Sequence, residues 1–162
     1  MSTQPSIKAV QVEHVTIESS KGFDAVKAAL EATLPRVDEG IAVLLRYGEA
    51  DRALAEMERA APLSIFGSRD HGALLLVAGL RRRAVQYDIG NPLTASRMTR
   101  HQLSAALYAP IRVLLREDAR GVVAFEYDRP ASTFGQFGDP EVDEVARHLD
   151  LELLGSLKAA AA

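Results

Sequence analysis

Two alternating segments joined by a short turn constrain the fold of this chain most strongly. IRVLLRED at residues 111–118 and GVVAFEYD at residues 121–128 both carry apolar side chains at every second position. Because successive side chains of a β-strand point to opposite faces, this period of two predicts two strands, each buried on one face. The DARG sequence that joins them is short enough to predict an antiparallel hairpin.

Further strand segments come earlier in the chain. AVQYDIG at residues 84–90 alternates in the same way, and LSIF at residues 63–66 forms a short apolar run. The longer apolar run ALLLVAGL, residues 73–80, predicts a buried strand that begins after the turn SRDHG. Residues 7–18 predict one more strand, whose alternation slips by one near Glu13 and His14, as a bulge or burial on both faces would cause.

Apolar residues at helical spacing predict four helices, at residues 19–35, 49–61, 93–108 and 139–162. The last has the clearest start, with Asp at the N-cap position and Pro at the first helical position. Residues 36–48 are compatible with either a strand or a helix. The helix residues expected to face the core are Phe23, Val26, Leu30, Leu34, Leu54, Met57, Met98, Leu103, Ala106, Leu107, Val142, Val145, Leu149, Leu153 and Leu157.

The order of these elements predicts the fold class. Helices are followed by consecutive strands, then by a helix, a hairpin and a final helix, which favours an α+β fold over a βαβ repeat. We therefore expect an antiparallel sheet packed by helices on one face. The 162 residues suffice for one domain with a continuous core, with flexible tails expected at about residues 1–6 and 158–162.

Charge and composition exclude several classes of protein. The formal net charge of −3 does not favour nucleic-acid binding, which usually needs a basic surface. No apolar window reaches the roughly 18 residues of a membrane helix, and no secretory signal is visible, so we expect no membrane partner. The lack of cysteine excludes disulfides and thiolate chemistry and is compatible with a cytoplasmic location, which we predict.

Common catalytic motifs are missing. The sequence contains no dinucleotide-binding glycine fingerprint, no phosphate-binding loop, no paired-histidine zinc motif and no nucleophile elbow. The four histidines, His14, His71, His101 and His148, show no ligand spacing, so we expect no metal site and can assign no cofactor.

His71 and Asn91 are two candidate ligand-binding residues at the ends of predicted strands. His71 follows Asp70 at a turn, where an imidazole can act as a base or can simply bond to the backbone. Asn91 precedes Pro92 at a predicted helix start, where backbone N–H groups can hold an anion. The same Asn91 can equally serve as an ordinary helix cap.

Four further candidates follow Asn91 in the sequence. Arg97 and His101 lie on the helix expected after Asn91, where they can assist anion binding or remain solvated. Tyr108 and Arg112 flank Pro110 at the entry to a strand. Arg112 can bind a carboxylate in a polar cavity or pair with a neighbouring strand.

The stretch from Tyr87 to Ser132 resembles the core of a bacterial and archaeal family, the domain of unknown function 302 (DUF302). The shared features are Gly90-Asn91-Pro92, Tyr108-Ala109-Pro110-Ile111, Glu117-Asp118 with Gly121, and Tyr127-Asp128-Arg129-Pro130. The resemblance covers about residues 10–157. It implies a small α+β domain similar in architecture to TATA-binding-protein-like folds, often dimeric and without a settled activity. His71 lies outside the matched motifs.

Three functional hypotheses remain. The first is a non-catalytic homodimer, or other homo-oligomer, that binds a small, partly apolar or anionic ligand between the sheet and the helices. The second is a metal-assisted or histidine-based small-molecule enzyme that uses His71 as a base. The third is a structural dimerisation module with Phe134 and Phe137 at the subunit contact.

Overall fold

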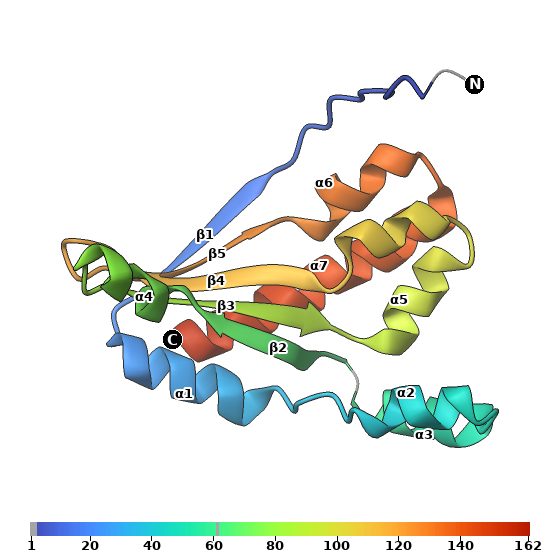
Figure 1. Ribbon diagram of the computed structural model, residues 1–162, viewed down its shortest axis with the longest axis horizontal. Coiled ribbons are helices and arrows are strands. Elements are labelled where there is room, and N and C mark those ends of the chain that lie inside the picture. Colours follow the sequence, from blue (N-terminus) through green and yellow to red (C-terminus); the bar gives the residue numbers. More distant parts are fainter. Residues whose placement is uncertain (1–2, 61) are drawn as a thin grey trace.

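The computed structural model describes residues 3–60 and 62–162 and shows one antiparallel sheet of five strands (Figure 1). The strand order is β1-β5-β4-β3-β2, so the predicted hairpin lies inside the sheet, between β1 and β3. The strands are β1 (His14–Ser19), β2 (Ser64–Asp70), β3 (Arg83–Gly90), β4 (Ile111–Glu117) and β5 (Val123–Asp128).

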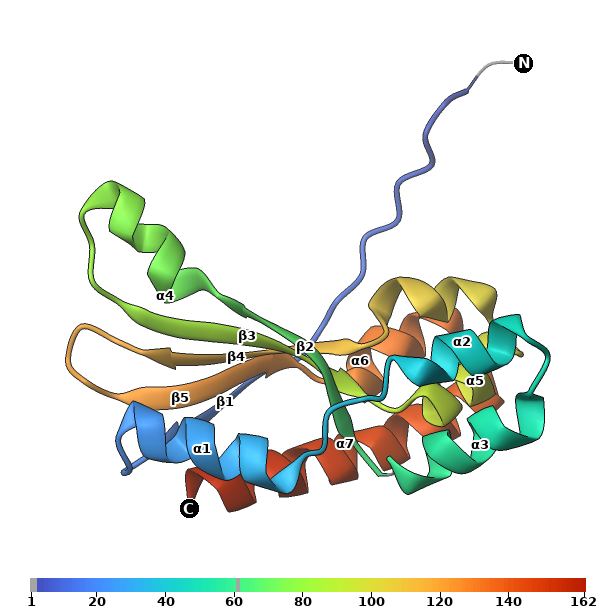
Figure 2. The ribbon, with the colours of Figure 1, turned by 60° about the horizontal axis from the view of Figure 1, so that its bottom comes forward.

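Helices α1 and α7 cover one face of this sheet, and most of the shorter helices gather at one end of it (Figures 1 and 2). This arrangement confirms the predicted α+β class. The α-helices are α1 (Phe23–Thr33), α2 (Gly40–Arg46), α3 (Ala50–Arg59), α4 (His71–Leu74), α5 (Pro92–Thr99), α6 (Pro130–Phe134) and α7 (Pro140–Ala161). Three 3₁₀ helices complete the described part of the fold: η1 (Leu75–Ala78), η2 (Leu103–Tyr108) and η3 (Gly135–Phe137).

The core lies between the sheet and the two long helices. The alternating apolar residues of β3, β4 and β5 all face inward, among them the fully buried Tyr87 and Phe125. Helix α7 contributes the predicted stripe that includes Leu153 and Leu157. As predicted, Asp139 caps this helix, its Oδ1 accepting hydrogen bonds from the backbone N–H groups of Glu141 and Val142.

The predicted buried strand at residues 73–80 is wrong. These residues form most of α4 and η1, and strands β2 and β3 pair directly with each other instead. Asp70 ends β2 and caps α4, because its Oδ1 accepts a hydrogen bond of 2.9 Å from the backbone N–H of Ala73. A short apolar run is compatible with a strand or a helix, and here the N-cap at Asp70 favours the helix.

Gly72 is essential to the seating of α4 against β3. A Cβ atom at this position would lie 2.3 Å from the carbonyl oxygen of Arg82 and 3.1 Å from the backbone nitrogen of Ala84. We expect Gly72→Ala to destabilise the protein by about 1–3 kcal/mol, because α4 must move off the strand. Urea unfolding measures this change, and Ala73→Ser on the exposed side of α4 is the matched control. An unfolding midpoint of Gly72→Ala equal to that of wild type would contradict the close contact.

Other predicted boundaries also need correction. Strand β1 begins at His14, not at residue 7. Residues 36–48, which were compatible with either a strand or a helix, contain helix α2. Residues 158–161 belong to α7, with Ala160 and Ala161 buried, so they do not form the expected flexible tail.

The helix predicted at 93–108 is divided into α5 and η2, because Arg100–Gln102 interrupts the helical repeat. The changed geometry after the break buries Ala105 and leaves Leu103 and Leu107 exposed. In α3 the buried residue is Ala53, whereas the predicted core residue Leu54 is exposed.

Candidate functional site

An apolar cavity of about 120 Å³ lies where β3 and β4 meet α5 and α7. Its walls include the Gly90-Asn91-Pro92 turn and the Ala109-Pro110-Ile111 strand entry, two of the sequence motifs singled out above. The cavity is lined by Phe66, Ile89, Gly90, Asn91, Pro92, Thr94, Ala95, Met98, Ala109, Pro110, Ile111 and Leu149. We call this space the apolar cavity.

Asn91 shapes the apolar cavity by holding α5 in place. Its Oδ1 accepts hydrogen bonds from the backbone N–H groups of Leu93 (2.8 Å) and Thr94 (3.2 Å), as an N-cap should. Its Nδ2 donates to the carbonyl oxygen of Met57 at 3.2 Å and so ties α5 to α3. Because both ends of the amide are engaged, Asn91 acts as a structural wall of the cavity.

A polar groove adjoins the apolar cavity between α5 and α7. Thr94 lines both spaces and therefore stands at their junction. On the α5 side the groove carries Arg97, Arg100 and His101. Its α7 side carries Glu141, Glu144, Val145 and His148. Two of the sequence candidates, Arg97 and His101, thus share one groove, next to the cavity that Asn91 lines.

Tyr108 and Arg112 line a third hollow, on the other side of the Pro110 segment. Pro110 and Ile111 border both this hollow and the apolar cavity. The Tyr108 ring packs edge-on against Phe134 and Phe137, with centroid distances of 6.3 and 6.1 Å. Tyr108 therefore has a packing role in this aromatic cluster in addition to lining the hollow.

Arg112 is exposed and alternates along β4 with the buried Ile111 and Val113, so it lies on the sheet face that α1 and α7 leave open. In the strand register it lies opposite Asp88 of β3, and it lines the same hollow as Asp128 of β5. Asp88 accepts a hydrogen bond of 2.8 Å from Arg69, and Asp128 lies 3.2 Å from Nδ1 of His14. Arg112 thus stands in a row of alternating charges across the open face.

His71 is separated from all the other candidates. It is exposed on α4, directly after Asp70, which pairs with Val85 of β3. Arg112 pairs with Asp88, three residues further along β3, and lies two strands away from β2. At about 3.3 Å per residue and 4.8 Å per strand spacing, the structure does not bring the His71 and Arg112 side chains together.

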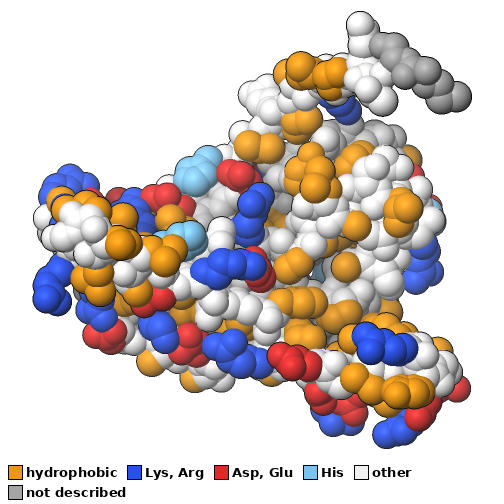
Figure 3. Space-filling view, viewed as in Figure 1, with side chains coloured by type: hydrophobic (Ala, Val, Ile, Leu, Met, Phe, Trp, Pro, Cys, Tyr) orange, Lys and Arg blue, Asp and Glu red, His pale blue; other side chains and the backbone are white. Residues whose placement is uncertain are grey.

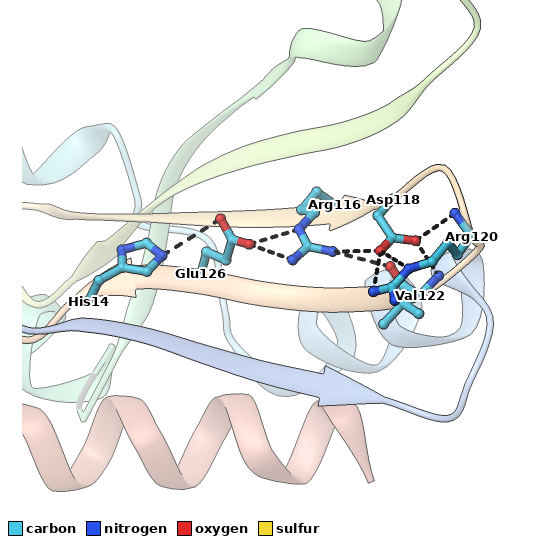
Figure 4. Close-up of polar contacts among 6 residues, drawn as sticks. All are labelled: His14, Arg116, Asp118, Arg120, Val122 and Glu126. Carbon is cyan, nitrogen blue, oxygen red and sulfur yellow. Dashed lines mark hydrogen bonds and ion pairs between the residues drawn. The ribbon is translucent and has the colours of Figure 1, made fainter.

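The open face carries a polar network that the sequence analysis did not single out (Figure 4). Arg116 of β4 donates from Nε and Nη2 to Oε1 of Glu126 on β5, at 2.8 and 2.6 Å. His14 Nε2 lies 3.7 Å from the other oxygen of Glu126. The outward positions of the predicted hairpin were a signal for this network, since opposite charges on the same face of neighbouring strands can pair even when they are diagonal to each other, as Arg116 and Glu126 are.

At the hairpin turn, Asp118 continues the same network (Figure 4). Its Oδ1 accepts hydrogen bonds from the backbone N–H groups of Val122 at 2.9 Å and Arg120 at 2.8 Å. These bonds, that of Val122 first, lower the pKa of Asp118 below its ordinary value despite partial desolvation. Asp118 therefore holds the turn as a carboxylate, which is a structural role.

On the covered face, Tyr87 and Glu31 form a polar pair. The Tyr87 hydroxyl donates to Oε1 of Glu31 at 3.0 Å, and Lys27 donates to both oxygens of the same carboxylate. Burial, reinforced by the Glu31 contact, raises the pKa of Tyr87 well above its ordinary value. Burial alone would raise the pKa of Glu31, but the hydrogen bonds from Lys27 and Tyr87 outweigh it and lower that pKa. The pair anchors α1 to the sheet and borders none of the three hollows.

In the described ranges 3–60 and 62–162, no three His, Asp or Glu side chains lie close enough together to hold a metal ion. Within the same ranges, no helix combines the length and the apolar character that crossing a membrane requires.

Comparison with known proteins identifies the family. The model of the domain of unknown function DUF302 matches residues 42–160, so this chain belongs to that family. The chain is also similar to a crystal structure described as an uncharacterized conserved protein DUF302 from Bacillus stearothermophilus. The two share 17% sequence identity, with a TM-score of 0.66 over 91% of this chain and 97% of that one. Comparison with curated proteins found no match.

These comparisons confirm the family resemblance and the fold. They assign no activity, because the family itself has no assigned function and a structure at this level of identity supports the fold alone.

Proposed function

We propose that the protein binds a small ligand with an apolar body and an anionic end. The apolar body occupies the apolar cavity, and the anionic end lies in the polar groove, near Thr94. The observation that carries the proposal is the cavity itself, whose walls are apolar apart from Thr94 and the fully engaged Asn91. Concave, mostly apolar spaces with a few polar groups at one side are the usual form of small-molecule sites.

The volume of the cavity limits the size of the ligand. An engineered cavity of about 150 Å³ in another protein accommodates benzene, so about 120 Å³ suits a body of roughly six carbon atoms. A carboxylate at the end of such a body would meet Arg97 and Arg100 on the α5 wall. It would bind away from Glu141 and Glu144, which repel it from the α7 wall.

Hexanoate and hexan-1-ol test this proposal as a pair of probes. Isothermal titration of the full chain should give a dissociation constant of about 0.1–1 mM for hexanoate, in keeping with its small number of atoms. Ala95→Phe places a large side chain at the cavity wall and should abolish binding of both probes. Ala55→Phe, at an exposed position of α3, is the matched control and should bind as wild type does.

Arg97 distinguishes the apolar part of the site from the anionic part. Arg97→Gln should weaken hexanoate binding about fivefold, as expected for loss of a partly exposed charge contact, and leave hexan-1-ol binding unchanged. Equal weakening of both probes would show that the groove does not hold the carboxylate. If neither probe binds wild type, or if Ala95→Phe binds as wild type does, the proposal fails.

The enzymatic hypothesis receives less support from the geometry. His71 lies apart from Tyr108 and Arg112, so neither of these two residues can act together with it on one bound substrate. Homodimer formation stays a prediction, which light scattering of the purified protein can test.

A further inference from the structure

The connection between β2 and β3 carries a compact group of exposed apolar side chains at the opposite end of the sheet from α5 and α6 (Figure 1). We call α4 and η1 together, with Gly79 and Leu80, the α4–η1 tip. Val77 is 92% exposed, Leu74 62% and Leu76 56%. Large apolar side chains at such exposure in one short segment are typical of an interaction site.

The fold enforces this exposure. Asp70 caps the start of α4, and Gly79 closes η1 in the left-handed conformation, with φ of 70°. The inner side of α4 lies against β3 at Gly72, where no side chain fits. The tip therefore has a defined shape, and it projects beyond the sheet (Figure 2).

Basic side chains flank the tip directly. Arg81 and Arg82 follow Leu80, and both are exposed. Over the described part of the chain, neither guanidinium takes part in an ion pair, whereas the next residue, Arg83, pairs with Asp24 and stacks over the Phe23 ring. Figure 3 shows apolar and basic side chains together at this end of the molecule.

We propose that the α4–η1 tip inserts its apolar side chains into the interface of a lipid bilayer with anionic headgroups, while Arg81 and Arg82 contact the phosphates. Interfacial binding of this kind combines a small apolar insertion with nearby cationic side chains and needs no spanning helix. This departs from the sequence-based expectation of no membrane partner, which rested on the lack of a spanning segment and of a secretory signal and did not consider interfacial binding.

Shape and charge favour a bilayer over a protein partner. A projecting tip of a few residues offers little area to a flat protein surface, where stable contacts bury about 800 Å² on each side. A bilayer interface can surround such a tip on all sides. Tip-to-tip contact between two copies would oppose Arg81 and Arg82 of one chain to the same charges of the other, which is unfavourable.

The charges around the tip set the conditions for binding. Asp24 is paired with Arg83, and Asp118 with Arg120, which lies beside the three arginines in one hollow. Glu117, in that same hollow, and Asp70, at the start of α4, are the nearby carboxylates that oppose approach to anionic lipid. Binding should therefore depend on the anionic lipid content and fall as salt rises.

A single substitution provides a direct reporter of insertion. The chain contains no tryptophan, so Val77→Trp introduces a unique fluorophore at the most exposed apolar position of the tip. With vesicles of phosphatidylglycerol and phosphatidylcholine in a 3:7 ratio, its emission should shift to shorter wavelength, as the indole leaves water. Leu107→Trp, at an exposed leucine of η2 on the far side of the molecule, is the matched control and should not shift.

Vesicle co-sedimentation separates the two parts of the proposed surface. Leu74→Ser with Val77→Ser should lower partitioning by about tenfold or more, and Arg81→Gln with Arg82→Gln by about fivefold for each charge at low salt. Leu103→Ser with Leu107→Ser, equally exposed leucines of η2, should bind as wild type does. All six substituted positions are exposed, so circular dichroism should show an unchanged fold.

Three outcomes would overturn the proposal. One is an absence of wild-type binding to the phosphatidylglycerol vesicles above that to pure phosphatidylcholine. Another is binding that the serine substitutions at the tip leave unchanged. The third is a wild-type dimer that those substitutions convert to a monomer, without any vesicle binding, which would assign the tip to a second copy of this chain.

Discussion

Replacing Phe134 by alanine is expected to destabilise the protein by about 3–5 kcal/mol, the usual effect of deleting a fully buried phenylalanine. Phe134 is 0% exposed and packs edge-on against Tyr108, where α6 meets the core. Its removal leaves a cavity that α6 and α7 can fill only by moving. Urea unfolding followed by circular dichroism measures the change in the free energy of unfolding.

Phe137 is the matched control for this experiment. It contacts the same Tyr108 ring but is only partly buried, so Phe137→Ala should cost about 1–2 kcal/mol. If the alanine variant of Phe134 does not fold, Phe134→Leu keeps most of the volume and should show a smaller loss. A Phe134→Ala variant as stable as wild type, with a lowered molecular mass in solution, would instead support the third hypothesis, in which Phe134 lies at a subunit contact.

The central strands and the last helix could be predicted because their local patterns agree with their tertiary environment. Along β4 and β5 every second residue is apolar, and one face of these strands is the core. Helix α7 has its cap, its proline and its apolar stripe in order. When one face of a strand or helix is buried and the other is exposed, apolar residues recur in the sequence with the period of that element.

The same reasoning failed at residues 73–80 for a physical reason. A run of apolar residues indicates that burying their side chains would be favourable. It does not indicate whether the fold places another apolar surface next to them. Strands β2 and β3 pair directly, so this run lies in the connection between them, outside the sheet. The tip is thus a place where local pattern and tertiary environment disagree, and such places tend to be functional.

The candidate site could be predicted only in part. Asn91 was identified from its Asn-Pro sequence, and it lines the apolar cavity. Three further wall residues, Phe66, Met98 and Leu149, come from β2, α5 and α7, and their meeting point depends on the packing of distant elements. No sequence spacing encodes that convergence, and the six polar candidates distribute over separate surfaces for the same reason.

Asp150 is a buried charge that joins the Arg129-Pro130 end of the family motif to α7. Its Oδ2 accepts a hydrogen bond of 2.7 Å from Nε of Arg129, and its Oδ1 accepts one of 3.0 Å from the backbone N–H of Ala131. Ala131 lies in the first turn of α6, where backbone N–H groups have no partner within the helix. The Asp150 carboxylate therefore provides a hydrogen-bond acceptor for a free backbone N–H at the start of α6 and connects α6 to α7.

Asp150→Ala is expected to lower the free energy of unfolding by about 2–3 kcal/mol, because it removes two hydrogen bonds to an ionised group and leaves the Ala131 N–H unsatisfied. Arg129 is half exposed and can be hydrated, which limits the loss. Asp150→Asn is the matched control, since its amide oxygen can still accept from Ala131, and it should lose about half as much. Equal losses for the two variants would show that the charge on Asp150, and not its contact with α6, stabilises this corner of the fold.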